Sequence, residues 1–224
     1  MLRALCIKEL REIWWLGLLP LAFMLYAVSD ESSLSPWLLV VSRSLDRWEK
    51  IPFGDSLFAL AALQWGCLLA AALGLWQSFR ESHSRTWHFL LHRPVDRQVI
   101  LTAKLFSAAV VYLLAIVLPV LGLAVWAAIP GTHASPFDWS LTASAWYAVS
   151  VGTAVYLSGM FAGLRRGRMI GTRWWPLVAT SIVVGATALS FLAPATVWIW
   201  GLLLFWDTLL IAAVRAELNS ADFN

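Results

Sequence analysis

The sequence predicts an all-α integral membrane protein with six transmembrane helices, and three observations carry that prediction. The chain of 224 residues is 60% hydrophobic, with a mean hydropathy of +0.74. Only 13% of its residues are charged, whereas a soluble domain has about a quarter. The charges cluster between apolar runs long enough to cross a membrane. Residues 1–224 are therefore expected to form a single membrane domain.

Residues 1–12 predict a short amphipathic helix before the first span. Leu2 and Leu10 fall near one helical face, and Lys8 and Arg11 fall elsewhere, a pattern suited to the membrane interface. A plain polar flank is equally compatible with these residues. A cleaved secretory signal is not expected, because charges interrupt the start and no small-residue cleavage site follows.

Six apolar runs are the candidate spans, separated by prolines and polar clusters. They are expected at about 13–29, 57–77, 99–129, 141–163, 176–192 and 196–214. Pro119 is expected to kink the third span. Pro194 divides the last apolar block, which is too long for one crossing at ~1.5 Å per residue. Residues 37–51 have apolar side chains at helical spacing with charges opposite, which predicts an interfacial helix on the far side.

The distribution of positive charge predicts the orientation. Thirteen of the sixteen Lys and Arg residues fall on the side of the N-terminus, and the others are Arg43, Arg47 and Lys50. By the positive-inside rule both termini and residues 78–98 are cytoplasmic, in a plasma membrane such as the bacterial inner membrane. The arginine-rich stretch 165–173 is interpreted as a topology signal that contacts anionic lipid, and not as a nucleic-acid site.

Two cysteines, Cys6 and Cys67, lie far apart and suggest neither a disulfide framework nor a metal site. Gly159 and Gly163 form a GxxxG pair, which allows close helix approach. That approach could occur within a bundle or between two chains.

Residues for catalysis or metal binding are scarce. Asp207 is the only acid inside a predicted span, about two turns from its cytoplasmic end. Such a carboxylate can be functional, but pairing with a nearby Arg or hydration is favoured. His88 and His92 lie one helical turn apart near His83, yet adjacent arginines would repel a cation, so surface histidines are favoured over a metal site. The sequence lacks a GxxxxGK[ST] loop for nucleotide phosphates.

Residues 81–104 read ESHSRTWHFLLHRPVDRQVILTAK. They resemble the cytoplasmic loop of ABC-2-type permeases, the membrane subunits of ATP-driven exporters, in which the second and third spans are joined by a stretch similar to E-x-x-x-G-T-x-E-F-L-L-S-L-P-V-S-R-x-x-I-x-x-x-K. The matching residues are Glu81, Thr86, Phe89, Leu90, Leu91, Pro94, Val95, Arg97, Ile100 and Lys104. The chain departs at Arg85, where glycine is usual, and at His88, where an acid is usual. Asp96 replaces the common serine.

The resemblance implies a coupling helix that docks on a separate nucleotide-binding subunit. Trp87 and Leu90 would supply its apolar surface, Pro94 would end it, and Asp96 would cap the third span. The ATPase-contact residues implied are Glu81, Arg85, Thr86, Trp87, His88, Leu90, Leu91, Arg93, Pro94, Asp96 and Arg97.

An exporter of this class pairs with a second permease chain, as a homodimer or heterodimer, and binds two copies of the ATPase, which hold ATP and Mg. This chain would then have no catalytic residue and no cofactor of its own. A haem- or cytochrome-maturation exporter is a narrower variant. The alternatives are a non-transporting membrane scaffold or assembly factor, and an intramembrane lipid-modifying enzyme. A charged loop without a partner is the simplest alternative for residues 78–98.

Overall fold

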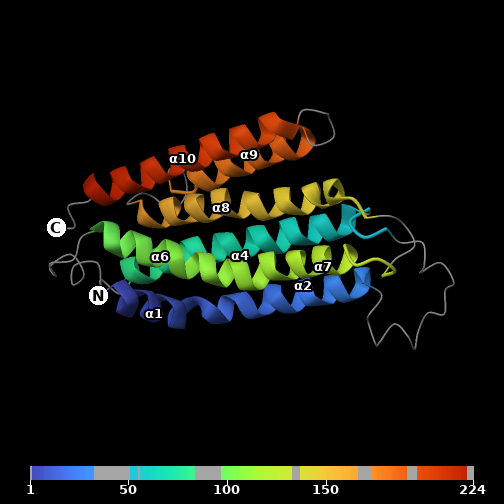
Figure 1. Ribbon diagram of the computed structural model, residues 1–224. Coiled ribbons are helices and arrows are strands. Elements are labelled where there is room, and N and C mark those ends of the chain that lie inside the picture. The colour runs from blue at the N-terminus through green and yellow to red at the C-terminus, as the bar shows by residue number, and fades with distance from the viewer. Residues whose placement is uncertain are drawn as a thin grey trace.

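The computed structural model describes residues 2–32, 51–54, 56–83, 97–132, 137–165, 173–190 and 196–220. Every secondary-structure element in these ranges is helical, and the helices lie side by side along one common direction (Figure 1). In chain order they are α1 (Leu2–Ile13), the 3-10 turn η1 (Trp14–Gly17), α2 (Leu18–Glu31), α4 (Ser56–His83), α6 (Arg97–Tyr112), the π-helical turn η3 (Leu113–Val117), α7 (Leu118–Ala127), the 3-10 turn η4 (Trp139–Thr142), α8 (Ala143–Leu164), α9 (Trp175–Ser190) and α10 (Thr196–Ser220).

Within the described ranges, five helical stretches are long and apolar enough to cross a membrane. They are Leu2–Glu31, Leu57–Arg80, Gln98–Ala127, Trp139–Leu164 and Trp198–Leu218. The shorter apolar helix Trp175–Ala188 corresponds to the fifth predicted span. The all-helical prediction is therefore confirmed for these residues, and the helices are consistent with a multi-pass membrane protein.

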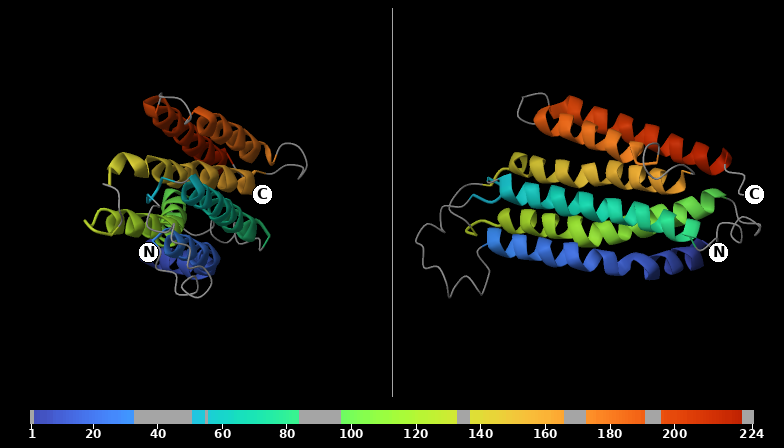
Figure 2. Two further views of the ribbon diagram at one scale, coloured as in Figure 1. Left: turned by 90° about the vertical axis from the view of Figure 1, so that its right-hand side faces the viewer. Right: turned by 180° about the vertical axis from the view of Figure 1, so that it is seen from behind.

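The central helix of the bundle is α8, which lies between α4 and the α9–α10 pair (Figure 2). Glycines allow its close approach to α4. A Cβ added at Gly74 would meet the backbone of Tyr156 and Met160, and one added at Gly159 would lie 3.3 Å from the Ala71 carbonyl oxygen. Gly163 faces the side chain of Ser78 in the same way. The GxxxG pair thus serves helix packing within the chain.

Two prolines change the helical hydrogen bonding without ending the helices. Pro119 is near the start of α7, directly after the π-helical turn η3. A proline has no N–H to donate, and its ring crowds the carbonyl four residues earlier, so a wider turn before it relieves the clash. Pro20 stands in the first turn of α2, after the 3-10 turn η1. The predicted disturbance at Pro119 therefore coincides with a π-helical turn between α6 and α7.

The helix α1 continues through η1 into α2 and packs against α6. It shows the amphipathic pattern expected for residues 1–12, but its buried side includes an acid, Glu9. At the other end of the chain, α10 extends to Ser220, past the end expected at 214. The start of α1 and the end of α10 lie at the same end of the bundle (Figure 1). The interfacial helix predicted at 37–51 lies outside the described residues except for Ile51.

Candidate functional site

A buried ion pair joins α1 to α6. The Nζ atom of Lys104 lies 3.2 Å from Oε1 and 3.3 Å from Oε2 of Glu9, and the two side chains are only 2% and 5% exposed. Lys104 also donates to the backbone carbonyl of Gln77 at 3.4 Å. Removing two charges from water is costly, and such a pair persists only where further hydrogen bonds complete it.

Gln77 on α4 extends this pair into a network over four helices. Its Nε2 donates to the Lys104 carbonyl at 3.4 Å and to Ser107 Oγ at 3.2 Å, both on α6. Ser107 Oγ in turn donates to the Lys104 carbonyl at 3.0 Å. Oε1 of Gln77 accepts from Tyr156 Oη of α8 at 2.7 Å. All of these side chains are buried, so α1, α4, α6 and α8 share one connected polar network, which fixes their relative positions.

A more exposed ion pair lies beside this network. Nη1 of Arg80 is 3.5 Å from Oε2 of Glu12, and the two side chains are 49% and 24% exposed. A pair with that exposure contributes little to stability, about 0–1 kcal/mol. It nonetheless joins the same two elements, α1 and the last turns of α4, as the buried network does.

Arg173 connects the chain before α9 to the end of α8. Its guanidinium donates to the Ala162 and Gly163 carbonyls, each at 3.1 Å, and stacks 4.3 Å above the ring of Phe79. Those carbonyls belong to the negative end of the α8 dipole, where a cation is stabilising. Partial burial lowers the pKa of Arg173, but a guanidinium stays charged in proteins. The sequence indicated a topology signal here, and the structure adds an internal role.

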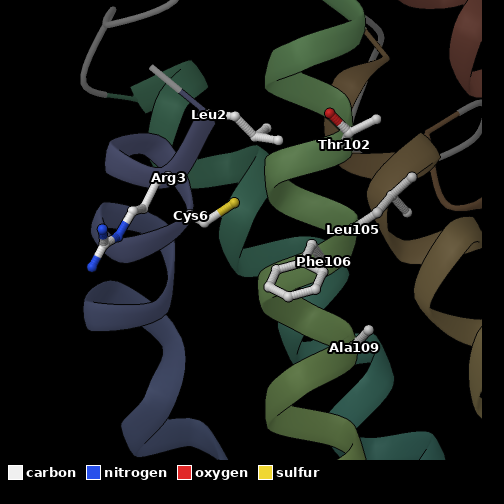
Figure 3. A pocket seen from close by; sticks show the side chains of 7 residues that line it. All are labelled: Leu2, Arg3, Cys6, Thr102, Leu105, Phe106 and Ala109. Atoms are coloured by element: carbon white, nitrogen blue, oxygen red, sulfur yellow. The ribbon is translucent and has the colours of Figure 1, made fainter.

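An apolar groove of about 670 Å³ runs between α1 and α6 (Figure 3). It is lined by Leu2, Arg3, Cys6, Thr102, Leu105, Phe106 and Ala109. Leu2 and Cys6 point across the groove towards α6, while Arg3 points away from it. The groove belongs to the same helix pair as the ion pair, and its lining offers almost no polar group for chemistry.

The implied ATPase-contact residues are described only at their two ends. Glu81 lies in the last turn of α4, and Arg97 is the first residue of α6. The others lie outside the described residues: Arg85, Thr86, Trp87, His88, Leu90, Leu91, Arg93, Pro94 and Asp96. Within the described ranges no group of three or more His, Cys, Asp or Glu side chains could hold a metal ion. His83 ends α4, while His88 and His92 fall outside those ranges.

Sequence reasoning missed the buried network, although one signal for it was present. Leu2, Leu5, Leu10 and Ile13 form the apolar stripe of α1, and Glu9 falls within this stripe at helical spacing. A charge at such a position indicates a buried partner. Gln77 and Tyr156 carry no comparable signal, because polar residues inside apolar spans are common on helix–helix contacts.

The structure corrects the expected surroundings of Asp207. This residue lies near the middle of the apolar stretch Trp198–Leu218 and not close to its end. Its Oδ2 lies 2.6 Å from Oγ1 of Thr153 on α8. The sequence favoured pairing with a nearby arginine or hydration, and the structure places a threonine hydroxyl beside the carboxyl.

No family model matches the chain, and no curated protein and no solved structure is significantly similar to it. The resemblance of residues 81–104 to ABC-2-type permeases therefore depends on the sequence motif alone. The buried network and the helices that it connects are the structural features that bear on function.

Proposed function

We propose that this chain is the permease subunit of an ATP-driven exporter, coupled through residues 78–98 to a separate ATPase subunit. The proposal combines the motif of residues 81–104 with one structural observation. Both helices that flank residues 84–96, α4 and α6, are held by the same buried network. A loop that receives force from a partner needs such an anchor to transmit it.

The positions of the network residues suit mechanical coupling. Gln77 lies two turns before the end of α4 at His83, and Lys104 lies two turns after the start of α6 at Arg97. Separating Lys104 from Glu9 would break a buried ion pair, at a cost of about 3–5 kcal/mol. A displacement of the two helix ends is therefore expected to carry α1 and α8 along with them.

Charge at the ends of the bundle supports the proposed orientation. All Lys and Arg residues in the described ranges belong to the end of the bundle where α1 starts and α10 ends: Arg3, Lys8, Arg11, Arg80, Arg97, Lys104, Arg165, Arg173 and Arg215. Positive charge favours the cytoplasmic side, which is where an ATPase would bind. In this proposal α9 is the fifth of six spans, although it is short.

The complete transporter in this proposal has two permease chains and two ATPase subunits in a plasma membrane, such as the bacterial inner membrane. ATP and Mg are bound by the ATPase subunits, and this chain performs no catalysis. Its other partner is membrane lipid. Two chains side by side would enclose the substrate path between them.

Co-purification tests the proposal. A tagged chain is extracted from membranes of its own host, and bound ATP-binding-cassette ATPase is quantified by mass spectrometry and by ATP hydrolysis. The double variant Trp87→Ala, Leu90→Glu is expected to lose the ATPase while still inserting into the membrane. The matched control is Phe137→Ala, Trp139→Ala at the opposite end of the bundle, which is expected to retain it. An ATPase that remains bound to the first variant, or no ATPase with the unmodified chain, would contradict the proposal.

A further inference from the structure

Asp207 is placed where an ionised carboxylate is least tolerated. It lies near the middle of the apolar stretch Trp198–Leu218, and Leu204, one turn earlier on the same side of α10, is 65% exposed. In a membrane-spanning helix such side chains face lipid. The part of the carboxyl that the chain leaves uncovered therefore faces hydrocarbon and not water, where a charge costs several kcal/mol or more.

The single hydroxyl proton of Thr153 indicates whether Thr153 or Asp207 donates the hydrogen bond between them. Oγ1 of Thr153 lies 2.7 Å from the Ser150 carbonyl oxygen and 2.6 Å from Asp207 Oδ2. A hydroxyl has one proton and two acceptor lone pairs, so Thr153 can donate to one of these two oxygens only. Both short contacts are hydrogen bonds if Asp207 carries a proton on Oδ2 and donates to Thr153, which then donates to Ser150.

The second carboxyl oxygen supports the same protonation state. Oδ1 of Asp207 is buried, and no hydrogen-bond donor among the described residues reaches it. A carboxylate oxygen left without a donor retains the full penalty of its charge. In a neutral acid this oxygen is an ordinary carbonyl, for which a missing partner costs much less.

The helices packed against α10 supply no counter-charge. The sequence of α8 contains two tyrosines as its only titratable side chains, and α9 contains none. Tyr147 is hydrogen-bonded to Val184 and Thr187, and Tyr156 to Gln77. Neither hydroxyl is directed to the carboxyl.

The charged residues of α10 itself lie at its end. Arg215 is eight residues from Asp207, which is about 12 Å along a helix axis at 1.5 Å per residue. Glu217 is farther away and has the same sign as an ionised Asp207. On the neighbouring α4, Cys67 packs with the cluster around Tyr147 and Val151. Lys104 is bound to Glu9 on the opposite side of α8.

We propose that Asp207 is a proton-binding site in the middle of the bundle, occupied by its proton in the structure described and linking α10 to α8 through Thr153. Loss of the proton would remove the hydrogen bond to Thr153 and leave a charge without a partner. The deprotonated form would then require α10 to move away from α8, or a cation to enter. This inference is independent of the proposed export function.

Infrared spectroscopy of the purified chain in lipid nanodiscs at pH 7 tests this proposal. The unmodified chain is expected to show the carbonyl stretch of a protonated carboxylic acid, and Asp207→Asn is expected to lose that band. Thr153→Val is expected to shift the band to higher frequency, because the acid loses its hydrogen-bond acceptor. Thr208→Val is the matched control, since Thr208 is an exposed neighbour that bonds only to the Phe205 carbonyl, and it should leave the band in place.

Three results would overturn the proposal. Asp207→Asn could leave the acid region unchanged and remove only carboxylate bands, which would mean that Asp207 is ionised. The acid band could appear only after removal of Na⁺ and K⁺, which would mean that a metal cation occupies the site. The band could also appear only when the chain is monomeric, which would assign the missing partner to a second copy. Because Thr153→Val retains Asp207, its band shift remains informative even if Asp207→Asn does not fold.

Discussion

Lys104 and Glu9 are 95 residues apart in the chain, yet their side chains meet at 3.2 Å in the interior of the bundle. This contact fixes the first helix to the helix that follows residues 84–96. The network that extends from it to Gln77 and Tyr156 connects α1, α4, α6 and α8 through one set of hydrogen bonds. The proposed coupling of this chain to an ATPase depends on that arrangement.

Removing one partner of the ion pair should cost more than removing both. Lys104→Met leaves the buried Glu9 carboxylate with only the more distant and exposed Lys8 ammonium, 3.9 Å from its Oε1. The free energy of unfolding is therefore expected to fall by about 3–5 kcal/mol, as when a buried pair loses one partner. The double variant Glu9→Leu, Lys104→Met should recover most of that loss. Unfolding in detergent, followed by circular dichroism, measures both. Arg11→Met, at an exposed side chain of the same helix, is the control and should have little effect; a double variant as unstable as Lys104→Met would refute the pairing.

The Tyr156 hydroxyl is expected to be needed because it satisfies a buried amide oxygen. Tyr156→Phe removes the 2.7 Å hydrogen bond to Oε1 of Gln77, and a buried polar group left unsatisfied costs about 1–3 kcal/mol. Thermal unfolding in detergent should therefore shift to lower temperature. Tyr26→Phe makes the same change at a side chain 64% exposed and should not shift it. Equal behaviour of the two variants would remove Tyr156 from the network.

The close packing of α4 on α8 predicts that Gly74 cannot be enlarged. A Cβ at this position would meet backbone atoms of Tyr156 and Met160, which cannot rotate away. Gly74→Ala is expected to destabilise the bundle by about 1–3 kcal/mol through overpacking. Gly122→Ala adds the same methyl group where no heavy atom lies within 4 Å and should be tolerated. Detergent unfolding of both variants side by side decides the matter, and a tolerated Gly74→Ala would contradict the helix contact.

Arg173 is expected to require its guanidinium and not only its charge. Arg173→Lys keeps the cation but loses the planar group that donates to two carbonyls and stacks on Phe79. Limited proteolysis between residues 165 and 173 should therefore become faster. Arg215→Lys is the control, because this exposed residue lies on α10, away from that segment. Unchanged cleavage of Arg173→Lys would show that charge alone suffices.

The sequence predicted the helices well because long apolar runs leave few alternatives. In hydrocarbon every backbone group must bond within its own helix, so runs such as 57–77 and 141–163 indicate α4 and α8 directly. Pro119 was also recognised as a point of disturbance. The π-helical turn that precedes it depends on the surrounding packing and could not be predicted.

The candidate site was less predictable because its contacts join distant parts of the chain. Lys104 was noticed as the last residue of the motif, but its partner Glu9 belongs to a different helix. Asp207 was recognised as unusual, while its position opposite Thr153 follows from the packing of α10 on α8. Neither pairing leaves a local pattern in the sequence.

The most direct test of the coupling proposal is a photo-crosslink from position 87. Trp87→benzoylphenylalanine is introduced into the full chain in its host membrane, with Trp139→benzoylphenylalanine at the opposite end of the bundle as the control. The proposal predicts a covalent adduct between position 87 and an ATP-binding-cassette ATPase, and no such adduct from position 139. No ATPase adduct from position 87, or equal adducts from both positions, would contradict it.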